Sequence, residues 1–172
     1  MPRLSVTTRS VRTRRRGKKW SPVLVSLSSN VNVAGDTATY VAMNEGICSN
    51  SNNTAQAPTA TVIKVGNIKV SFDMWKSGTF LGLAEVYIMF RPQGMNIDAS
   101  YCVAHPEYIM CWRTFDVIND NQSITIQSRL KRNLNSGDSI ILYVRYKNIV
   151  APTTPQSSLA INGIVSYVCC AN

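Results

Sequence analysis

Alternation of apolar and polar residues is the feature that most limits the fold of this chain. In residues 68–74 every second residue is apolar: Ile68, Val70, Phe72 and Met74. Spacing of this kind turns one face of a β-strand toward a core and the other toward water. Residues 122–130 repeat the pattern, and no stretch of ten or more residues shows the 3.6-residue spacing of an amphipathic helix. The sequence therefore predicts an all-β protein.

Turn residues divide the chain into about eight strand segments. The segments are residues 21–33, 37–43, 61–75, 82–91, 107–115, 122–130, 139–147 and 159–169. Segment 82–91 is apolar on both faces, which predicts a strand covered on both sides. Residues 48–58 are predicted to be an exposed loop, and residues 95–106 a loop or a short helix that Pro106 ends. Strands joined by loops without long helices predict a single eight-stranded antiparallel jelly roll, a form of β-sandwich.

Positive charge is concentrated at the N-terminus. The whole chain has a net charge of +9, and residues 1–20 contain eight basic residues and no acidic one. These basic residues are Arg3, Arg9, Arg12, Arg14, Arg15, Arg16, Lys18 and Lys19. Residues 21–172 contain ten basic and nine acidic residues, a net charge of +1. We therefore divide the chain into a basic, flexible N-terminal arm, residues 1–20, and a jelly-roll domain, residues 21–172.

The arm is predicted to bind nucleic acid. Closely spaced lysines and arginines neutralise phosphates and release counterions, with little dependence on base sequence. Residues 12–19 also match the composition of a nuclear localisation signal, and transit-peptide composition is the alternative. The signal residues are Arg12, Arg14, Arg15, Arg16, Lys18 and Lys19. Trp20 closes the arm, where it is expected either to stack on a base or to anchor the arm to the barrel wall.

A smaller basic cluster lies within the domain. Arg129, Lys131 and Arg132 follow the predicted strand 122–130. They are a second candidate for phosphate contact, and the alternative is an exposed strand end at a subunit interface.

No catalytic, metal or cofactor site is predicted. His105 is the only histidine and precedes Pro106, and motifs for a serine nucleophile elbow or a phosphate-binding loop are missing. The five cysteines form no C-x-x-C pair, so we expect reduced, partly buried thiols. No apolar run approaches the roughly 20 residues that cross a bilayer. We expect neither an enzyme nor a membrane-inserted protein.

Three phrases follow the arm in a fixed order. They are VYIMFRPQG at 86–94, HPEYIMCWR at 105–113 and SRLKRNLNSGDSIIL at 128–142. Together with the arginine-rich arm, they resemble the capsid proteins of circoviruses and circo-like viruses. These viruses have small circular single-stranded DNA genomes that encode a replication initiator. The chain departs from the circovirus pattern in being shorter and in having a less extended arm.

The resemblance implies a function and a set of partners. It implies a jelly roll that assembles, usually as about sixty copies with T=1 symmetry, into an icosahedral shell around single-stranded DNA. It also implies an inward-facing arm that acts as a nuclear localisation signal, read by a host nuclear import receptor. The protein would then be found in the virion and, during assembly, in the host nucleus. Two alternatives stay open: a satellite-type coat protein with RNA cargo, and a cellular nucleic-acid-binding β-barrel with a basic extension.

Overall fold

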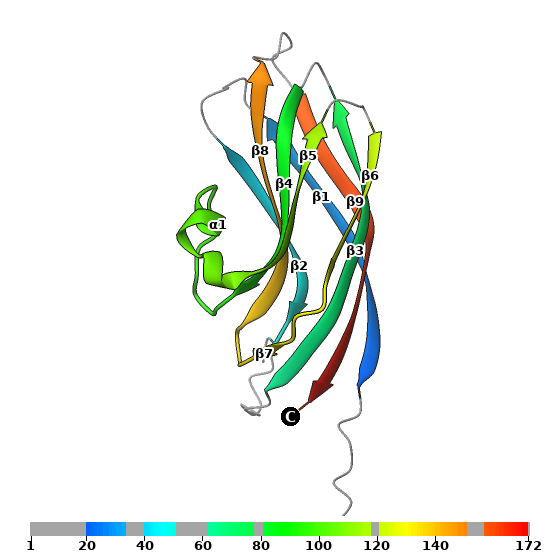
Figure 1. The fold of residues 1–172 in the computed structure, drawn as a ribbon, viewed down its shortest axis with the longest axis vertical. Helices are drawn as coiled ribbons and strands as arrows, with labels where there is room; N and C mark the ends of the chain where they lie inside the picture. The colour runs from blue at the N-terminus through cyan, green and yellow to red at the C-terminus, as the bar shows by residue number, and fades with distance from the viewer. Residues whose placement is uncertain are drawn as a thin grey trace, which may run out of the picture.

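The fold consists of two antiparallel β-sheets packed face to face (Figure 1). It is seen in a computed structural model that describes residues 20–33, 40–50, 62–77, 81–117, 121–150 and 157–171. The described residues form nine strands, one α-helix and one 3₁₀-helix. In chain order these are β1 (Ser21–Val33), β2 (Val41–Ser49), β3 (Ile63–Ser77), β4 (Leu81–Arg91), α1 (Tyr101–Ala104), η1 (Pro106–Tyr108), β5 (Ile109–Val117), β6 (Asn121–Ser128), β7 (Arg132–Leu134), β8 (Ser139–Val150) and β9 (Ser157–Ala171).

The strand order is that of a jelly roll, as the sequence predicts. One sheet has the order β1-β9-β3-β6, with the short β7 also paired to β3, and the other has the order β2-β8-β4-β5. Successive strands β1 and β2, β3 and β4, and β5 and β6 lie in opposite sheets, while the first strand pairs with the last. Such a double-sheet arrangement of antiparallel strands is one of the ways in which all-β proteins limit their exposed edges.

The core lies between the two sheets and follows the alternation in the sequence. On β3, Val70 and Met74 are at most 1% exposed. Ile124 and Ile126 of β6 are buried beside them, as predicted. The opposite sheet contributes alternate residues of β4 and β8 to the same cluster, namely Ala84, Val86, Ile88, Ile140, Leu142, Val144 and Tyr146. Burial of these side chains is the main favourable term in folding such a domain.

β4 and β8 are also buried on their outer face, as the sequence predicts for β4. Here α1 and the segment around it cover a second cluster, which consists of Tyr87, Met89, Tyr101, Cys102, Ile141 and Tyr143. In Figure 1 this helical segment lies beside the sheet, outside the sandwich. The predicted short helix within residues 95–106 is thus confirmed, and η1 begins at Pro106, where a proline's missing N–H is tolerated.

Several boundaries of the predicted strands are wrong. Glu107 and Tyr108 belong to η1 and not to the predicted strand 107–115, and residues 129 and 130 of the predicted strand 122–130 follow the end of β6. The second strand begins at Val41, after Tyr40, and continues to Ser49, into the predicted loop 48–58. Residues 37–39 of the predicted strand 37–43 lie outside the described residues. Within this strand the pairing with β8 shifts between Gly46 and Cys48. An extra strand, β7, raises the number above eight, since the three residues that follow Lys131 pair with β3. Residues 51–58 lie outside the described part of the chain.

β3 contains a bulge near its start, at the end of the sheet where β1 begins. The pairing of β3 with β9 shifts between Gly66 and Lys69. Asn67 has a φ of 51°, in the left-handed region that asparagine tolerates better than most residues. Because of the bulge, Val65 and Ile68 both point into the core. The bulge therefore places Gly66 and Lys69 on the outer face of the sheet.

Candidate nucleic-acid interface

The interface is built on the outer face of the β1-β9-β3 sheet, where β1 begins. The strand register aligns Ser21 of β1, Cys169 of β9, Val65 of β3 and Arg132 of β7 in one row. Val65 points into the core, so its neighbours Lys64 and Gly66 face outward. This row lies at the lower end of Figure 1, where β1 begins, β9 ends and β7 is found. Residues 1–19 directly precede Trp20 in the sequence, so the arm joins the domain at this end.

Trp20 and Lys131 are in direct contact. The Lys131 ammonium nitrogen lies 5.3 Å from the centre of the Trp20 ring, within the range of a cation–π interaction. The aliphatic part of Lys131 passes over Gly66: a Cβ added at Gly66 would lie 2.8 Å from Lys131 Cγ. Trp20 is half-buried. The indole thus packs against the domain at the point where the arm begins, which favours the anchoring role over base stacking.

Further lysines and an arginine surround this contact. Lys64 and Lys69 lie on the outer face of β3 on either side of Gly66, and Arg129 is exposed just beyond β6. No ion pair joins these three side chains to any carboxylate in the described ranges. We call Trp20, Lys64, Lys69, Arg129 and Lys131 the basic platform.

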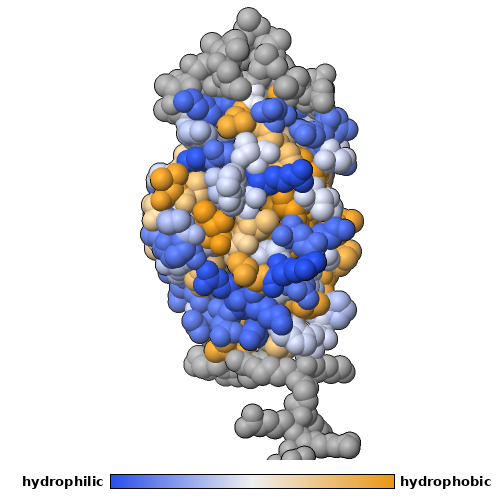
Figure 2. Space-filling model, viewed as in Figure 1, coloured by the Kyte–Doolittle hydropathy of each residue, from blue (hydrophilic) through white to orange (hydrophobic). Residues whose placement is uncertain are grey.

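Acidic residues are scarce near the basic platform. Among the strands of this sheet, β1, β3, β6, β7 and β9, the one acidic residue is Asp73. Asp73 accepts a hydrogen bond from the Ser123 hydroxyl, on the half of β3 that is remote from Trp20. In Figure 2 hydrophilic side chains gather over the lower part of the view, where Figure 1 shows β7. The sheet therefore has a positive end next to Trp20, while its far end contains both Asp73 and Lys76 and is close to neutral.

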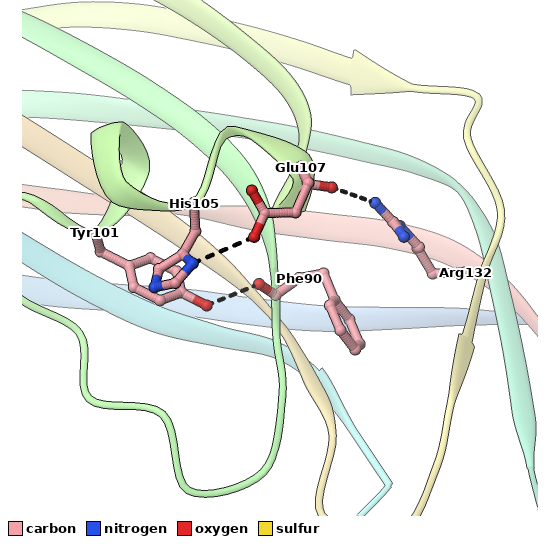
Figure 3. Close-up of polar contacts among 5 residues, drawn as sticks. All are labelled: Phe90, Tyr101, His105, Glu107 and Arg132. Atoms are coloured by element: carbon pink, nitrogen blue, oxygen red, sulfur yellow. Dashed lines mark hydrogen bonds and ion pairs between the residues drawn. The ribbon is translucent and has the colours of Figure 1, made fainter.

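Arg132 has a structural role that the other members of its cluster lack. One terminal nitrogen of its guanidinium donates a 2.6 Å hydrogen bond to the backbone carbonyl of Glu107, as Figure 3 shows. The guanidinium carbon also lies 5.6 Å from the centre of the Phe90 ring. Arg132 thereby joins β7 to η1 and to the end of β4. Its charge remains close to the basic platform, but its geometry is fixed by protein contacts.

His105 and its neighbours form the segment that Arg132 holds. His105 Nδ1 lies 3.2 Å from Glu107 Oε1, and the imidazole stacks on the Tyr108 ring with centres 5.2 Å apart. A hydrogen bond from its own backbone and the contact with His105 lower the pKa of Glu107. The Tyr101 hydroxyl donates to the Phe90 carbonyl at 3.1 Å (Figure 3). His105 is thus a hydrogen-bonded turn residue, the role its position before Pro106 suggests.

The sequence prediction and the structure overlap in part at this site. The predicted arm contacts Arg3, Arg9, Arg12, Arg14, Arg15, Arg16, Lys18 and Lys19 all lie outside the described residues and stay predictions. Of the predicted domain cluster, Lys131 lies against Trp20, and Arg129 is exposed two residues before Lys131 in the sequence. Sequence reasoning did not select Lys64 and Lys69. The alternation of β3 did place Lys69 on the wet face, but only the structure shows Lys131 lying over Gly66 of the same strand.

The described part of the chain contains no metal-binding cluster and no membrane-spanning helix. No group of three or more histidine, cysteine or acidic side chains could hold a metal ion there. Among the described helices, none is long and apolar enough to cross a membrane. All five cysteines are free thiols, with Cys102 and Cys170 buried and the other three half-buried. Partly buried free thiols are what the sequence predicts.

Comparison with known proteins finds similar structures but assigns the chain to no family. No protein-family model matches the sequence, and no curated protein matches it. A bacterial lipoprotein from Bacteroides thetaiotaomicron has a TM-score of 0.50 at 8% identity, over 92% of this chain and 91% of that chain. A structure of Desmodium yellow mottle tymovirus has a TM-score of 0.36 at 15% identity, over 96% and 93% of the two chains. A structure of sacbrood virus of honeybee has a TM-score of 0.44 at 14% identity, over 85% and 80%.

These structural similarities do not establish a function for this chain. The lipoprotein, at 8% identity, shares the fold alone. The two viral matches have TM-scores below 0.5 and carry no argument about this chain.

Proposed function

We propose that this protein is a viral capsid protein whose jelly roll assembles into a shell and whose arm packages nucleic acid. The observation that carries the proposal is the continuity of charge between arm and domain. Eight basic residues precede Trp20, and Trp20 packs against Lys131 on the basic platform. In this proposal arm and platform together offer one positive surface to a polyanion, while the rest of the domain has six basic and nine acidic residues, a net charge of −3.

The proposed mechanism is multivalent phosphate neutralisation. For single-stranded nucleic acid, log affinity falls against log salt with a slope of about −0.7 for each phosphate neutralised. Full use of the eight arm charges would give a slope of roughly −5 to −6. One arm alone binds weakly at physiological salt, but a closed shell multiplies the attraction by bringing many arms to one strand. The device packages nucleic acid without reading its sequence, and no reaction is catalysed.

The finer features of the proposal rest on the resemblance to circovirus capsid proteins. They are a T=1 homo-oligomer of about sixty copies, single-stranded DNA as cargo, and a circovirus-like virus as the source. Residues 12–19 would be read by a nuclear import receptor, so that assembly takes place in the host nucleus. The order of the phrases at 86–94, 105–113 and 128–142 supports these features.

Electron microscopy of the recombinant protein, with absorbance at 260 and 280 nm on the same fraction, tests the proposal. Uniform closed shells with a high ratio of absorbance at 260 nm to that at 280 nm are expected. DNase and RNase treatment of opened shells then identifies the cargo. Monomers at high protein concentration and neutral salt would contradict the capsid function, and small nucleic-acid-bound species would favour the cellular binding module.

Deletion of residues 1–19 tests the role of the arm separately. Because Trp20 is retained, the packing against Lys131 and the start of β1 are kept. We expect the truncated protein to fold and to lose most of its affinity for a single-stranded oligonucleotide. Unchanged affinity, with an unchanged salt slope, would remove the arm from the proposed mechanism.

A further inference from the structure

A cavity on the outer face of the second sheet has the features of an anion site. It has a volume of about 360 Å³ and lies where β2 and β4 end and β8 begins. We call it the Arg91 pocket. Its lining residues are Asn44, Gly46, Ile47, Cys48, Ser49, Arg91, Gly137, Ser139 and Ile141. This pocket belongs to the sheet that does not contain the basic platform.

Strand pairing brings three polar side chains of the pocket together. Ser49 of β2 pairs with Ser139 of β8, and Ser139 pairs with Arg91 of β4. The three residues therefore form one row across neighbouring strands, which are spaced about 4.8 Å apart. Arg91 continues the outward series of Tyr87 and Met89 on β4, so its side chain lies on the same outer face. Two hydroxyl groups and a guanidinium thus line one side of the cavity.

Gly46 accounts for the hollow itself. The register between β2 and β8 shifts between Gly46 and Cys48, which bends the edge strand. A Cβ added at Gly46 would meet no atom within 4 Å. The cavity therefore lies above a bare stretch of backbone, with the Asn44 side chain on the side opposite to Ser49. The neighbouring Glu45 lies between two outward-facing residues and so points to the other face by alternation.

Arg91 is a cation without a carboxylate partner. No ion pair joins it to an acidic residue in the described ranges, and its Nε is buried without a hydrogen-bond partner. The carboxylate of Asp138, next to Ser139, instead accepts the backbone N–H groups of Gln93 and Asn135 at 3.1 and 2.9 Å. An unpaired buried donor costs free energy, and each such group in a native structure calls for an explanation. Arg91 lines the cavity, so a molecule bound there would lie next to its side chain.

We propose that the Arg91 pocket binds a tetrahedral oxyanion of the phosphate class. The planar guanidinium presents paired donors that match two oxygens of a phosphate group, while the hydroxyls of Ser49 and Ser139 donate to the remaining oxygens. Asn44 provides an amide donor from the other wall. The ligand is either free phosphate or the terminal phosphate of a small monoester, since the cavity is larger than the ion alone. This inference does not depend on the proposed capsid function.

Isothermal titration calorimetry of the full chain with inorganic phosphate tests the site. The matched variants are Arg91→Met and Arg113→Met. Each removes one positive charge from the domain and keeps the basic residues of the arm. Arg113 lies on β5 with its guanidinium over the Phe115 ring at 5.2 Å, outside the pocket. We expect saturable binding to the unchanged protein and to R113M, and at least tenfold weaker binding to R91M. Equal phosphate affinity of R91M and R113M, or no saturable binding to the unchanged protein, would overturn the proposal.

Further variants and ligands make the result decisive. If circular dichroism shows that R91M does not fold, Gly46→Leu takes its place. The added side chain would fill the cavity and leave the charge of Arg91 unchanged. G46L is expected to lose phosphate binding, and retained binding would contradict the site. Glycerol 3-phosphate distinguishes the two sources of ligand: binding as tight as that of phosphate assigns the pocket to a phosphate monoester, and weaker binding assigns it to the free ion.

Discussion

The ammonium of Lys131 lies 5.3 Å from the centre of the Trp20 ring, although the two residues are far apart in the sequence. The contact exists because β7 and β9 both pair with β3, which brings the segment after β6 over the start of β1. Gly66 leaves room for the Lys131 stem between them. The contact fixes Trp20, the residue that directly follows the basic run of the sequence, to the basic platform.

The first prediction concerns the charge of Lys131. Replacement of Lys131 by Met keeps the stem over Gly66 and removes one cation from the basic platform. We expect the salt slope of single-stranded DNA binding to become less negative by about 0.7, because one phosphate contact is lost. The measurement is the affinity for a short oligonucleotide at several salt concentrations.

Lys147→Met is the matched control for this prediction. The Lys147 ammonium lies 5.6 Å from the Tyr40 ring, a similar contact on the opposite sheet. Loss of the same charge there should leave the salt slope unchanged. If K131M and K147M change the slope equally, the basic platform has no special role in binding.

The second prediction concerns Gly163 in β9. A Cβ at this position would lie 2.2 Å from the Ser71 carbonyl oxygen and 2.5 Å from Phe72 Cα, both backbone atoms of β3. The two strands must separate to admit it, so Gly163→Ala should lower the free energy of unfolding by about 1–3 kcal/mol, the usual effect of overpacking. Urea denaturation of the dissociated subunit measures the change. Gly46→Ala, with open space at the added Cβ, should stay within about 0.5 kcal/mol of the parent protein.

The third prediction concerns the ion pair between Glu85 and Arg145. Arg145 Nη2 lies 2.6 Å from Glu85 Oε2, and the side chains are 12% and 14% exposed. The hydroxyl of Tyr87 donates to the same oxygen at 2.8 Å, and the Arg145 guanidinium lies over the Tyr40 ring at 4.0 Å. Arg145→Met should lower the free energy of unfolding by about 2–4 kcal/mol, because a poorly solvated carboxylate is left without its cation.

A double variant separates this cause from simple loss of packing. Replacement of both partners, Arg145→Met with Glu85→Leu, removes the uncompensated charge. We expect it to recover more than half of the stability that R145M loses. Equal instability of the single and double variants would show that the guanidinium acts by packing on Tyr40 and not by pairing with Glu85.

The strands and the core could be predicted from the sequence because they depend on local alternation. Val70, Phe72 and Met74 are buried as their spacing predicts. The end of β2 could not be predicted from the sequence, because the bulge between Gly46 and Cys48 interrupts the alternation and the next residues are polar. β7 was missed for a different reason: its three residues form a strand by pairing with β3, a contact that local pattern does not encode.

The candidate site was predictable in its composition but not in its arrangement. The sequence marks Trp20, Arg129 and Lys131 as candidates, yet only the register of β3 shows that Lys64 and Lys69 belong with them. Arg132 looks like its neighbours in the sequence. Its hydrogen bond to the Glu107 carbonyl depends on where η1 lies relative to β7, which is a tertiary relationship.

The last prediction concerns stability at alkaline pH. Tyr101 is 2% exposed, and burial raises the pKa of its hydroxyl from 10.0 to about 12. Its stabilising contribution is therefore complete below pH 10, falls as the unfolded chain ionises first, and is lost as the pH rises through about 12. Tyr101→Phe should cost about 1 kcal/mol at neutral pH, because the Phe90 carbonyl loses its donor. The variant should then lose less stability than the parent between pH 10 and 12. Urea denaturation across this pH range measures both effects, and parallel pH profiles for the two proteins would show that the Tyr101 hydroxyl does not titrate with unfolding.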